Sequence, residues 1–267
     1  MPADRITTAR LAAMKNRGER IACLTCYDAA FCRLLEEAAI DVLLVGDSLG
    51  NVLQGRATTV PVTLEHMIYH SACVSRVSDR ALIIADLPFM SYATPERAID
   101  AAARLMGEGG VAMVKLEGGA EVVETVRLLT RFGAPVCAHL GLLPQSVHQL
   151  GGYRYQGRDQ AGAAAIRADA LALQDAGASL LILECVPADL AAALTAELRI
   201  PVIGIGAGNR CDGQVLVLHD MLGLLPGRSP RFSKDFLAEA GSVQAALAAY
   251  VGAVRDGSFP GPDQTLA

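Results

Sequence analysis

The chain has 267 residues, of which 52% are hydrophobic and only 19% are charged, with 23 basic against 28 acidic side chains and a net charge of -5. Such a composition is typical of a folded chain with a large core and excludes an intrinsically disordered one. The acidic balance argues against a nucleic-acid binder, which usually carries a basic patch. The length fits one or two domains, or a single α/β barrel of about 250 residues.

The beginning of the chain predicts a cytoplasmic protein. Residues 1–20 mix charges into a helical pattern and contain no apolar signal-peptide segment. No stretch reaches the roughly 18 strongly apolar, uncharged residues of a membrane span, so we expect no membrane partner. The seven cysteines are an odd number and most lie in or beside apolar runs, which favours reduced core thiols. Cys23 and Cys26 form a CxxC pair, but no second pair completes a zinc site.

Taken in chain order, the elements begin with an amphipathic helix over Thr7–Arg17, placed at the bottom of a barrel. Eight short apolar runs follow, with Ala-rich helical segments between them. Continuous Val, Ile and Leu runs are typical of parallel strands buried on both faces. Because no linker interrupts the eight repeats, we predict a single (β/α)8 TIM-barrel domain over 1–267, with an N-terminal helix, rather than an open doubly wound sheet. The predicted strands are Ile21–Cys26, Val42–Val45, Leu82–Ala85, Ala112–Leu116, Val136–Ala138, Leu180–Leu183, Val202–Ile205 and Val215–Leu218.

Two connections are too long to be simple turns. They span 46–63, after the second predicted strand, and 140–162, after the fifth. Loops longer than about 12 residues in a compact domain tend to be functional or mobile. Both follow the carboxyl ends of their strands, where a barrel enzyme keeps its chemistry. The end of the chain, 257–267, is rich in Gly and Pro, and we expect a loosely ordered tail there.

Four of the eight predicted strands end on a carboxylate: Asp47, Asp86, Glu117 and Glu184. One acidic residue in that position often caps the next helix, but the carboxyl ends of all strands meet at one mouth of a barrel. Four carboxylates there repel one another unless a cation or protons compensate. All-oxygen ligands favour Mg²⁺, which keeps places for water or substrate oxygens. The sequence therefore predicts a magnesium site at this mouth.

Two further residues are candidates at the same mouth. Lys115 lies two positions before Glu117, so strand periodicity turns both to one face. Its ammonium would neutralise a substrate carboxylate or a developing enolate, or else form a structural Lys–Glu ion pair. His139 ends the fifth predicted strand, where it either reaches the mouth or is a hydrogen-bonded structural residue.

Two other motifs carry weaker signals. His66 and His70 share one helix face at i, i+4 spacing, but no HExxH signature is present, which favours a solvated or interface face. The run GIGAGN at 204–209 places its third glycine one position early for a dinucleotide fingerprint, and we interpret it as a tight turn after the seventh strand.

An ordered set of motifs runs along nearly the whole chain. The segments are TCYDA at 25–29, VGDSLGNVLQG at 45–55, TVPVTLEHMIYH at 59–70, DLPFMSY at 86–92, VKLEGG at 114–119, HLGLLPQSVHQLGGYRYQGR at 139–158, LECVP at 183–187 and IGIGAGNRCDGQVLVLHDMLGL at 203–224. This set resembles the ketopantoate hydroxymethyltransferase family. The resemblance implies a (β/α)8 barrel, Mg²⁺, 5,10-methylenetetrahydrofolate as co-substrate and a homodecamer.

The resemblance also implies an activity. A hydroxymethyl group passes from 5,10-methylenetetrahydrofolate to C3 of 3-methyl-2-oxobutanoate through an enolate of the Mg²⁺-chelated oxoacid. The product, 2-dehydropantoate, begins the pantoate branch of pantothenate biosynthesis. Carried over position by position, the implied metal ligands are Asp47, Asp86 and Glu117, the substrate contacts are Asp47, Ser48, Asp86 and Lys115, and the proton acceptor is Glu184.

The chain departs from the family pattern at Leu143, where threonine is common, and at Tyr155, where a smaller apolar residue is usual. Both concern loop packing and cofactor fit. The residues that contact folate stay open, since Arg154 and Arg158 could meet its glutamyl carboxylates or an adjacent subunit. Two other function classes are a Mg²⁺-dependent C–C lyase or mutase of the phosphoenolpyruvate mutase and isocitrate lyase type, and a non-catalytic metabolite-binding barrel. The motifs at 115–119 and 183–187 and the long loop after the fifth strand favour the transferase.

Overall fold

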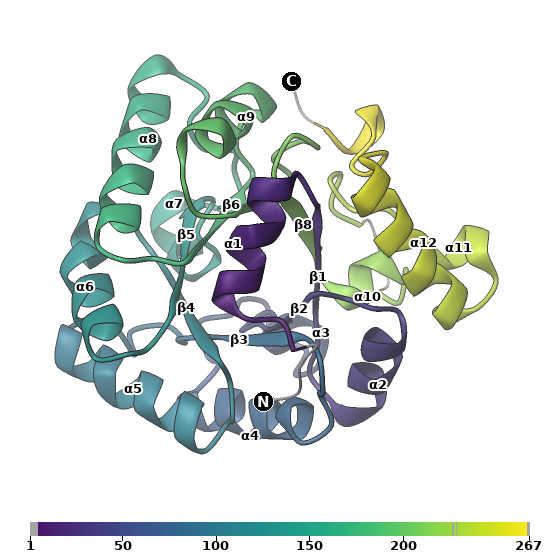
Figure 1. Cartoon of the computed structure of the whole chain (residues 1–267), viewed down its shortest axis with the longest axis horizontal. Helices are drawn as coiled ribbons and strands as arrows, with labels where there is room; N and C mark the ends of the chain where they lie inside the picture. Colours follow the sequence, from purple (N-terminus) through teal and green to yellow (C-terminus); the bar gives the residue numbers. More distant parts are fainter. Residues whose placement is uncertain (1–4, 226, 228, 266–267) are drawn as a thin grey trace.

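The structure, a computed structural model, describes residues 5–225, 227 and 229–265, and within them the chain forms a closed parallel barrel. Each strand pairs in parallel with the next, and β8 closes the ring by pairing with β1. Helices surround the ring of strands (Figure 1). The predicted (β/α)8 fold is therefore confirmed. The strands are β1 Ile21–Thr25, β2 Val42–Val45, β3 Leu82–Asp86, β4 Met113–Glu117, β5 Val136–Gly141, β6 Leu180–Glu184, β7 Val202–Ile205 and β8 Gly213–Leu216.

The strands are buried almost completely because helices cover them outside and side chains fill the barrel inside. The larger outer helices are α2 Ala29–Glu37, α4 Leu64–Ser75, α5 Pro95–Gly107, α6 Val123–Arg131, α8 Gln160–Asp175, α9 Ala188–Glu197 and α12 Val243–Asp256. Helix α5 begins with the Thr94 side chain accepting from the backbone N–H of Arg97 and with Pro95 in the first turn. No helix among the described residues is long and apolar enough to cross a membrane.

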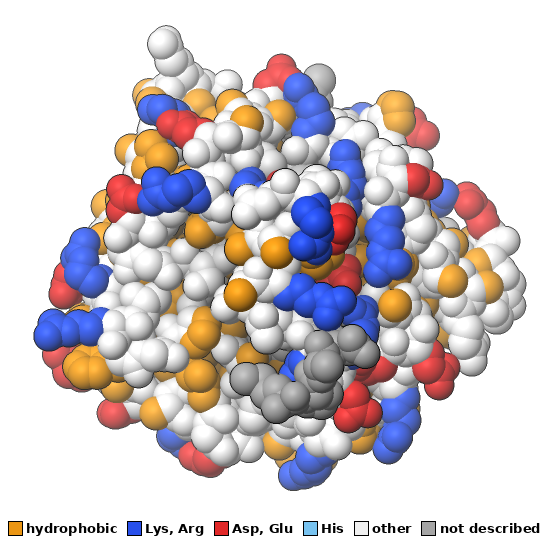
Figure 2. Space-filling model, in the orientation of Figure 1, with side chains coloured by type: hydrophobic (Ala, Val, Ile, Leu, Met, Phe, Trp, Pro, Cys, Tyr) orange, Lys and Arg blue, Asp and Glu red, His pale blue; other side chains and the backbone are white. Residues whose placement is uncertain are grey.

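Helix α1, Thr8–Arg17, closes the bottom of the barrel, as predicted (Figure 1). The Thr7 side chain accepts from the Arg10 N–H at its start, and Gly18, with φ 70°, ends it in the left-handed region. The Lys15 ammonium lies 2.7 Å from the Asp212 carboxylate, directly before β8, which fixes the helix to the amino ends of the strands. The face over α1 carries charged side chains of both signs (Figure 2).

Strand β8 lies two residues earlier than predicted. Leu218 instead begins the short helix α10, Leu218–Met221, because its backbone N–H donates to the Thr25 hydroxyl at the end of β1. Gly213, the first residue of β8, pairs with both Ile21 and Ile203, and a Cβ there would collide with the Ile21 carbonyl. A glycine therefore permits the close approach that completes the ring.

The C-terminal part packs more tightly than the predicted loose tail over 257–267. Phe259 is only 3% exposed and packs edge-on against Phe236 and Tyr250. The Tyr250 hydroxyl lies 2.8 Å from the Cys23 carbonyl and 3.0 Å from the Gln214 carbonyl, so α12 spans the β1–β8 seam. Residues 266 and 267 of the predicted tail lie outside the described residues. Other short elements are α11 Leu237–Ala240 and the 3-10 turns η1 Ala120–Val122 and η3 Pro262–Gln264.

The weaker motifs have structural places. His66 accepts at Nδ1 from the Thr63 N–H in a capping box, and His70 Nδ1 lies 2.8 Å from the Tyr27 carbonyl. Each ring thus serves its own local contact. The GIGAGN run forms a turn with Gly206 and Gly208 in the left-handed region, and all seven cysteines of the described chain are free, as predicted.

Candidate active site

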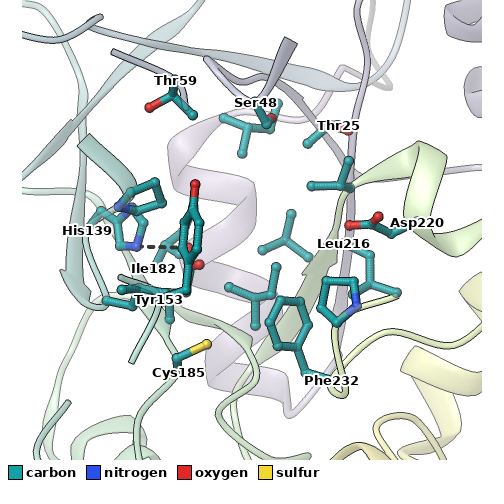
Figure 3. Close-up of a pocket in the computed structure, with 18 of the residues that line it drawn as sticks. Thr25, Ser48, Thr59, His139, Tyr153, Ile182, Cys185, Leu216, Asp220 and Phe232 are labelled. Atoms are coloured by element: carbon teal, nitrogen blue, oxygen red, sulfur yellow. Dashed lines mark ion pairs between the residues drawn. The ribbon is translucent and has the colours of Figure 1, made fainter. Parts of the chain in front are cut away.

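A cavity of about 500 Å³ opens at the carboxyl-terminal mouth of the barrel, within the range of about 300–1,000 Å³ that is typical of small-molecule sites (Figure 3). Both predicted long loops border it. The first contains α3, Leu49–Val52, and the second contains the 3-10 turn η2, Pro144–Ser146, and α7, Val147–Leu150. All seven candidate residues from the sequence line this one cavity: Asp47, Ser48, Asp86, Lys115, Glu117, His139 and Glu184.

Lys115 is the positive centre of the group. Its Nζ lies 2.7 Å from Asp86 Oδ1 and 3.9 Å from Glu117 Oε1. Burial opposes its charge, but the carboxylates of Asp86, Glu117 and Asp47 outweigh burial and raise the pKa of Lys115 above its usual range. The ammonium is therefore permanently charged at neutral pH. It neutralises part of the negative charge that the four strand ends bring together.

Glu117, His139 and Glu184 form a row on three consecutive strands, β4, β5 and β6. His139 Nδ1 lies 3.7 Å from Glu117 Oε1, and its Nε2 lies 3.4 Å from Glu184 Oε2, the contact dashed in Figure 3. Burial, with the nearby Lys115 charge, lowers the pKa of His139 well below its usual value, so the imidazole is neutral. Neither ring nitrogen has a hydrogen-bond partner among the described residues. His139 thus reaches the mouth and keeps its nitrogens free for a ligand or water.

The pKa values of two carboxyl groups are raised toward neutrality. Burial, with the neighbouring Asp86 charge, raises the pKa of Asp47 to about 7. Burial likewise raises the pKa of Glu184 to about 7, although Lys115 acts in the opposite direction. A carboxyl group with such a pKa can both accept and return a proton near pH 7.

Ser48 is oriented by its neighbours. Its Oγ lies 2.9 Å from the Tyr27 hydroxyl, and Tyr27 is buried. The backbone N–H of Asp47 donates to Asp86 Oδ2 at 3.0 Å, which joins the ends of β2 and β3. A Cβ on Gly46 would lie 2.8 Å from Ser48 Oγ, so the glycine leaves room for this hydroxyl.

Gln145 is a site residue that the sequence reasoning missed. It is buried in η2 of the second long loop, and its Nε2 donates to Asp47 Oδ2 at 2.8 Å and to the Leu87 carbonyl at 2.9 Å. Its Oε1 accepts from the Tyr92 hydroxyl at 2.7 Å, and its backbone N–H donates to Glu117 Oε2 at 3.0 Å. No periodicity marks a glutamine inside a loop, so only its place among the carboxylates could reveal this role.

Other cavity residues were also not singled out by the sequence. Tyr153 follows η2 and α7 in the second long loop, Phe232 belongs to the segment after β8, and Asp220 belongs to α10. Tyr155, noted as a departure from the family pattern, lines the cavity too. Arg154 and Arg158, the open candidates for folate contact, are exposed and are not among the lining residues.

The donor set suits Mg²⁺ better than a metal that needs a protein cage. Among the described residues, no three His, Cys, Asp or Glu side chains converge closely enough to hold an ion, so the predicted trio of Asp47, Asp86 and Glu117 is not gathered into a closed site. Asp47 and Asp86 lie side by side, and Gln145 contacts Asp47 through its side chain and Glu117 through its backbone N–H. Mg²⁺ usually takes one or two carboxylates and completes its shell with water and substrate oxygens. The residues present therefore fit that ion.

The family model described as ketopantoate hydroxymethyltransferase matches residues 5–262. The chain belongs to this family. The 3-methyl-2-oxobutanoate hydroxymethyltransferase 1 of Burkholderia ambifaria is 56% identical over 261 residues, which cover 98% of this chain and 96% of the relative. The 3-methyl-2-oxobutanoate hydroxymethyltransferase of Burkholderia thailandensis is 58% identical with the same coverage. The resemblance identified from the motifs is thus confirmed, and the family is one of enzymes.

The solved structures that resemble this chain share its barrel at low identity. A phosphoenolpyruvate phosphomutase from Streptomyces platensis has a TM-score of 0.62 at 14% identity and covers 89% of each chain. A phosphonopyruvate hydrolase, solved with oxalate and Mg²⁺, has a TM-score of 0.62 at 11% identity and covers 97% of this chain and 91% of its own. These likenesses concern the fold. They match the fold expected for the lyase or mutase alternative, while the close relatives by sequence are transferases.

Proposed function

We propose that this chain transfers a hydroxymethyl group from 5,10-methylenetetrahydrofolate to C3 of 3-methyl-2-oxobutanoate and so produces 2-dehydropantoate, the first step of the pantoate branch of pantothenate biosynthesis. One observation carries the proposal beyond family membership: the Lys115–Asp86 ion pair and the Glu184 carboxyl group face the same cavity. A buried ammonium beside a desolvated carboxyl group suits the removal of a proton next to a carbonyl.

The metal in the proposal is Mg²⁺. Asp47 and Asp86 would hold it, with Glu117 the third acidic group at its edge. When bound, the ion polarises the keto group of the oxoacid and makes the hydrogen on C3 more acidic. Gln145 supports this arrangement by holding Asp47 through its side chain and Glu117 through its backbone N–H.

The protein's own groups then divide the chemistry between them. Glu184 accepts the proton from C3, because burial keeps its carboxyl group poorly solvated and therefore basic. Lys115 stabilises the negative charge that the oxoacid gains when the proton leaves. The neutral ring of His139 lies 3.4 Å from the Glu184 carboxyl group and adds no positive charge that would lower its basicity. The Ser48 hydroxyl, set by Tyr27, is a donor for the substrate carboxylate.

The proposal also covers the binding partners, the oligomeric state and the location of the protein. The substrates are small molecules, an oxoacid and a reduced folate, with no nucleic-acid or membrane partner. Family resemblance supports a homodecamer in the cytoplasm. Light scattering after size exclusion tests the assembly, because a monomer or dimer at micromolar concentration would contradict it.

The decisive experiment follows the C3 hydrogen of 3-methyl-2-oxobutanoate by proton NMR in D₂O with Mg²⁺. The native chain should exchange this hydrogen without folate, and Glu184→Gln should exchange it at least about 100-fold more slowly. Mg²⁺-dependent binding of the oxoacid should be retained in that variant. Glu37→Gln, on an exposed position at the end of α2, is the matched control and should exchange normally.

The outcomes separate the alternatives. Exchange that is unchanged in Glu184→Gln removes Glu184 from the base role. Consumption of the oxoacid without folate indicates a lyase or mutase, and binding without exchange indicates a non-catalytic metabolite-binding barrel. Formation of the hydroxymethyl product only when methylenetetrahydrofolate is added supports the transferase.

A further inference from the structure

A fifth acidic side chain lines the cavity away from the four strand-end carboxylates. Asp220 lies in α10, directly after β8, and is only 9% exposed. In Figure 3 it stands across the cavity from His139, whose dashed contact marks the Glu184 side. Of the groups that the mechanism above uses, Ser48 lines a second, smaller cavity together with Asp220, but no step is assigned to Asp220 itself. Asp220 is therefore a buried ionisable residue with access to the cavity and no part in the oxoacid chemistry.

The carboxylate of Asp220 has no protein partner among the described residues. None of them donates a hydrogen bond to it or forms an ion pair with it, although Lys and Arg side chains elsewhere in the described chain pair with many other carboxylates. Burial raises the pKa of Asp220. A carboxylate that is partly desolvated and has no protein donor is costly, and a ligand that brings two N–H groups to it offsets this cost. The position thus favours a ligand with paired donors.

The chemistry of the two substrates indicates which of them binds on the Asp220 side of the cavity. This step rests on the proposed function. The oxoacid is an anion with acceptor oxygens only, which Asp220 would repel. A reduced folate carries an aminopyrimidinone ring whose 2-amino group and ring N3–H point the same way, a pair of donors that matches the two oxygens of a carboxylate.

We propose that Asp220 is the residue that recognises the pterin ring of the folate, by accepting its 2-amino and N3 hydrogens. The two ends of a pterin explain the arrangement. The aminopyrimidinone edge and the N5 edge, which carries the one-carbon unit, lie at opposite ends of the fused rings. A ring bound at Asp220 therefore turns N5 toward the wall of Lys115 and Glu184, where C3 of the oxoacid reacts.

The walls between the two groups suit a flat ring. Leu216, Ile205 and Val215 line the cavity, and Phe232, another lining residue, lies below Asp220 in the view of Figure 3. Tyr153 extends into the cavity from the second long loop and is 55% exposed. A bound pterin ring would cover part of this exposed side chain. Apolar and aromatic side chains around a single polar anchor are the usual make-up of a site for a heterocycle.

The test measures folate binding apart from the reaction. Tetrahydrofolate, the product form, is titrated calorimetrically into the native chain and into Asp220→Asn, which keeps the shape but puts an amide donor opposite the ring hydrogens. Loss of a charge-assisted pair predicts binding weaker by roughly 10- to 100-fold. Asp189→Asn, an exposed residue paired with Arg210, is the control and should bind normally. The second ligand is an analogue of tetrahydrofolate with a methyl group in place of the 2-amino group. The native chain should bind this analogue more weakly than tetrahydrofolate, whereas Asp220→Asn should bind the two ligands almost equally.

Each result has one meaning. Weaker tetrahydrofolate binding in Asp220→Asn, with C3–H exchange of the oxoacid still present, supports the assignment. If Asp220→Asn binds tetrahydrofolate within about twofold of the native chain, the assignment is overturned and the proposed function stays intact. The same holds if both proteins prefer tetrahydrofolate over the methyl analogue by the same factor. Loss of C3–H exchange in Asp220→Asn also overturns it, because the residue would then serve the oxoacid. Absence of exchange and transfer in the native chain itself would refute the proposed function.

Discussion

Replacing Gln145 by leucine tests whether one buried amide holds the acidic site together. The change keeps the bulk of the side chain but removes its donors to Asp47 and the Leu87 carbonyl and its acceptor for Tyr92. The bond to a carboxylate is worth about 1.5–3 kcal/mol and each of the other two about 0.5–1.5 kcal/mol. Water from the open cavity can replace the donor to Asp47, so we expect a loss of about 3 kcal/mol in the free energy of unfolding.

For a chain of this length, about 1 kcal/mol lowers Tm by roughly 2–4 °C, which gives a fall of roughly 6–12 °C by scanning calorimetry. Loss of a residue that orients a metal ligand typically weakens metal binding about 10- to 100-fold, and titration with Mg²⁺ measures this. Removing the Gln145 donor should also raise the pKa of Asp47 further, because that bond now lowers it.

Tyr92→Phe is the matched control, since it removes one neutral hydrogen bond to the same amide and leaves the contact with Asp47. We expect it to cost about 1 kcal/mol and to leave Mg²⁺ binding unchanged. If Gln145→Leu is no less stable than Tyr92→Phe and binds Mg²⁺ within twofold of the native chain, the reasoning about Gln145 is refuted.

Three further predictions concern charge, packing and pH. Lys115→Met leaves Asp86 as a buried carboxylate without its cation and should cost about 3–5 kcal/mol in the free energy of unfolding, measured in urea at neutral pH; a loss below about 1 kcal/mol would contradict this. Tyr250→Phe removes the hydroxyl between α12 and the β1–β8 seam and should cost about 1–2 kcal/mol with kcat unchanged, so a large loss of kcat would mean that the seam shapes the site. The rate of C3–H exchange should rise with pH and be half-maximal at or below about pH 7, because burial raises the pKa of Glu184 to about 7 and a bound cation lowers this pKa. A midpoint above pH 8 would exclude Glu184 as the base.

Strand positions could be predicted from the sequence because parallel strands covered on both faces require unbroken apolar runs. Val42–Val45 and Val202–Ile205 occur as predicted, and four other strands, β3 to β6, end one or more residues later than predicted. The long helix α8 is less readily predicted. Its beginning is rich in Ala and Gly and depends on Asp159, which accepts from the Gly162 N–H at the start of the helix.

The acidic residues at the strand ends could be placed for a similar reason. The carboxyl ends of all the strands of a barrel lie at the same mouth, so residues at these ends are expected to lie near one another before any contact between them is known. Asp47, Asp86, Lys115, Glu117, His139 and Glu184 therefore share a cavity as expected. Gln145 and Asp220 could not be found in this way, because each belongs to a connecting segment whose path depends on packing.

By itself the sequence determined the barrel, the mouth at which the cavity opens and the charged residues that gather there, since all three follow from strand burial and strand order. Tertiary structure alone decided how those residues divide their contacts. It pairs Lys115 with Asp86, engages Glu117 with Gln145, and leaves Glu184 beside a neutral His139. It also sets Asp220 on the opposite wall. Distances between side chains from different strands and loops depend on register and loop paths, which no local pattern encodes.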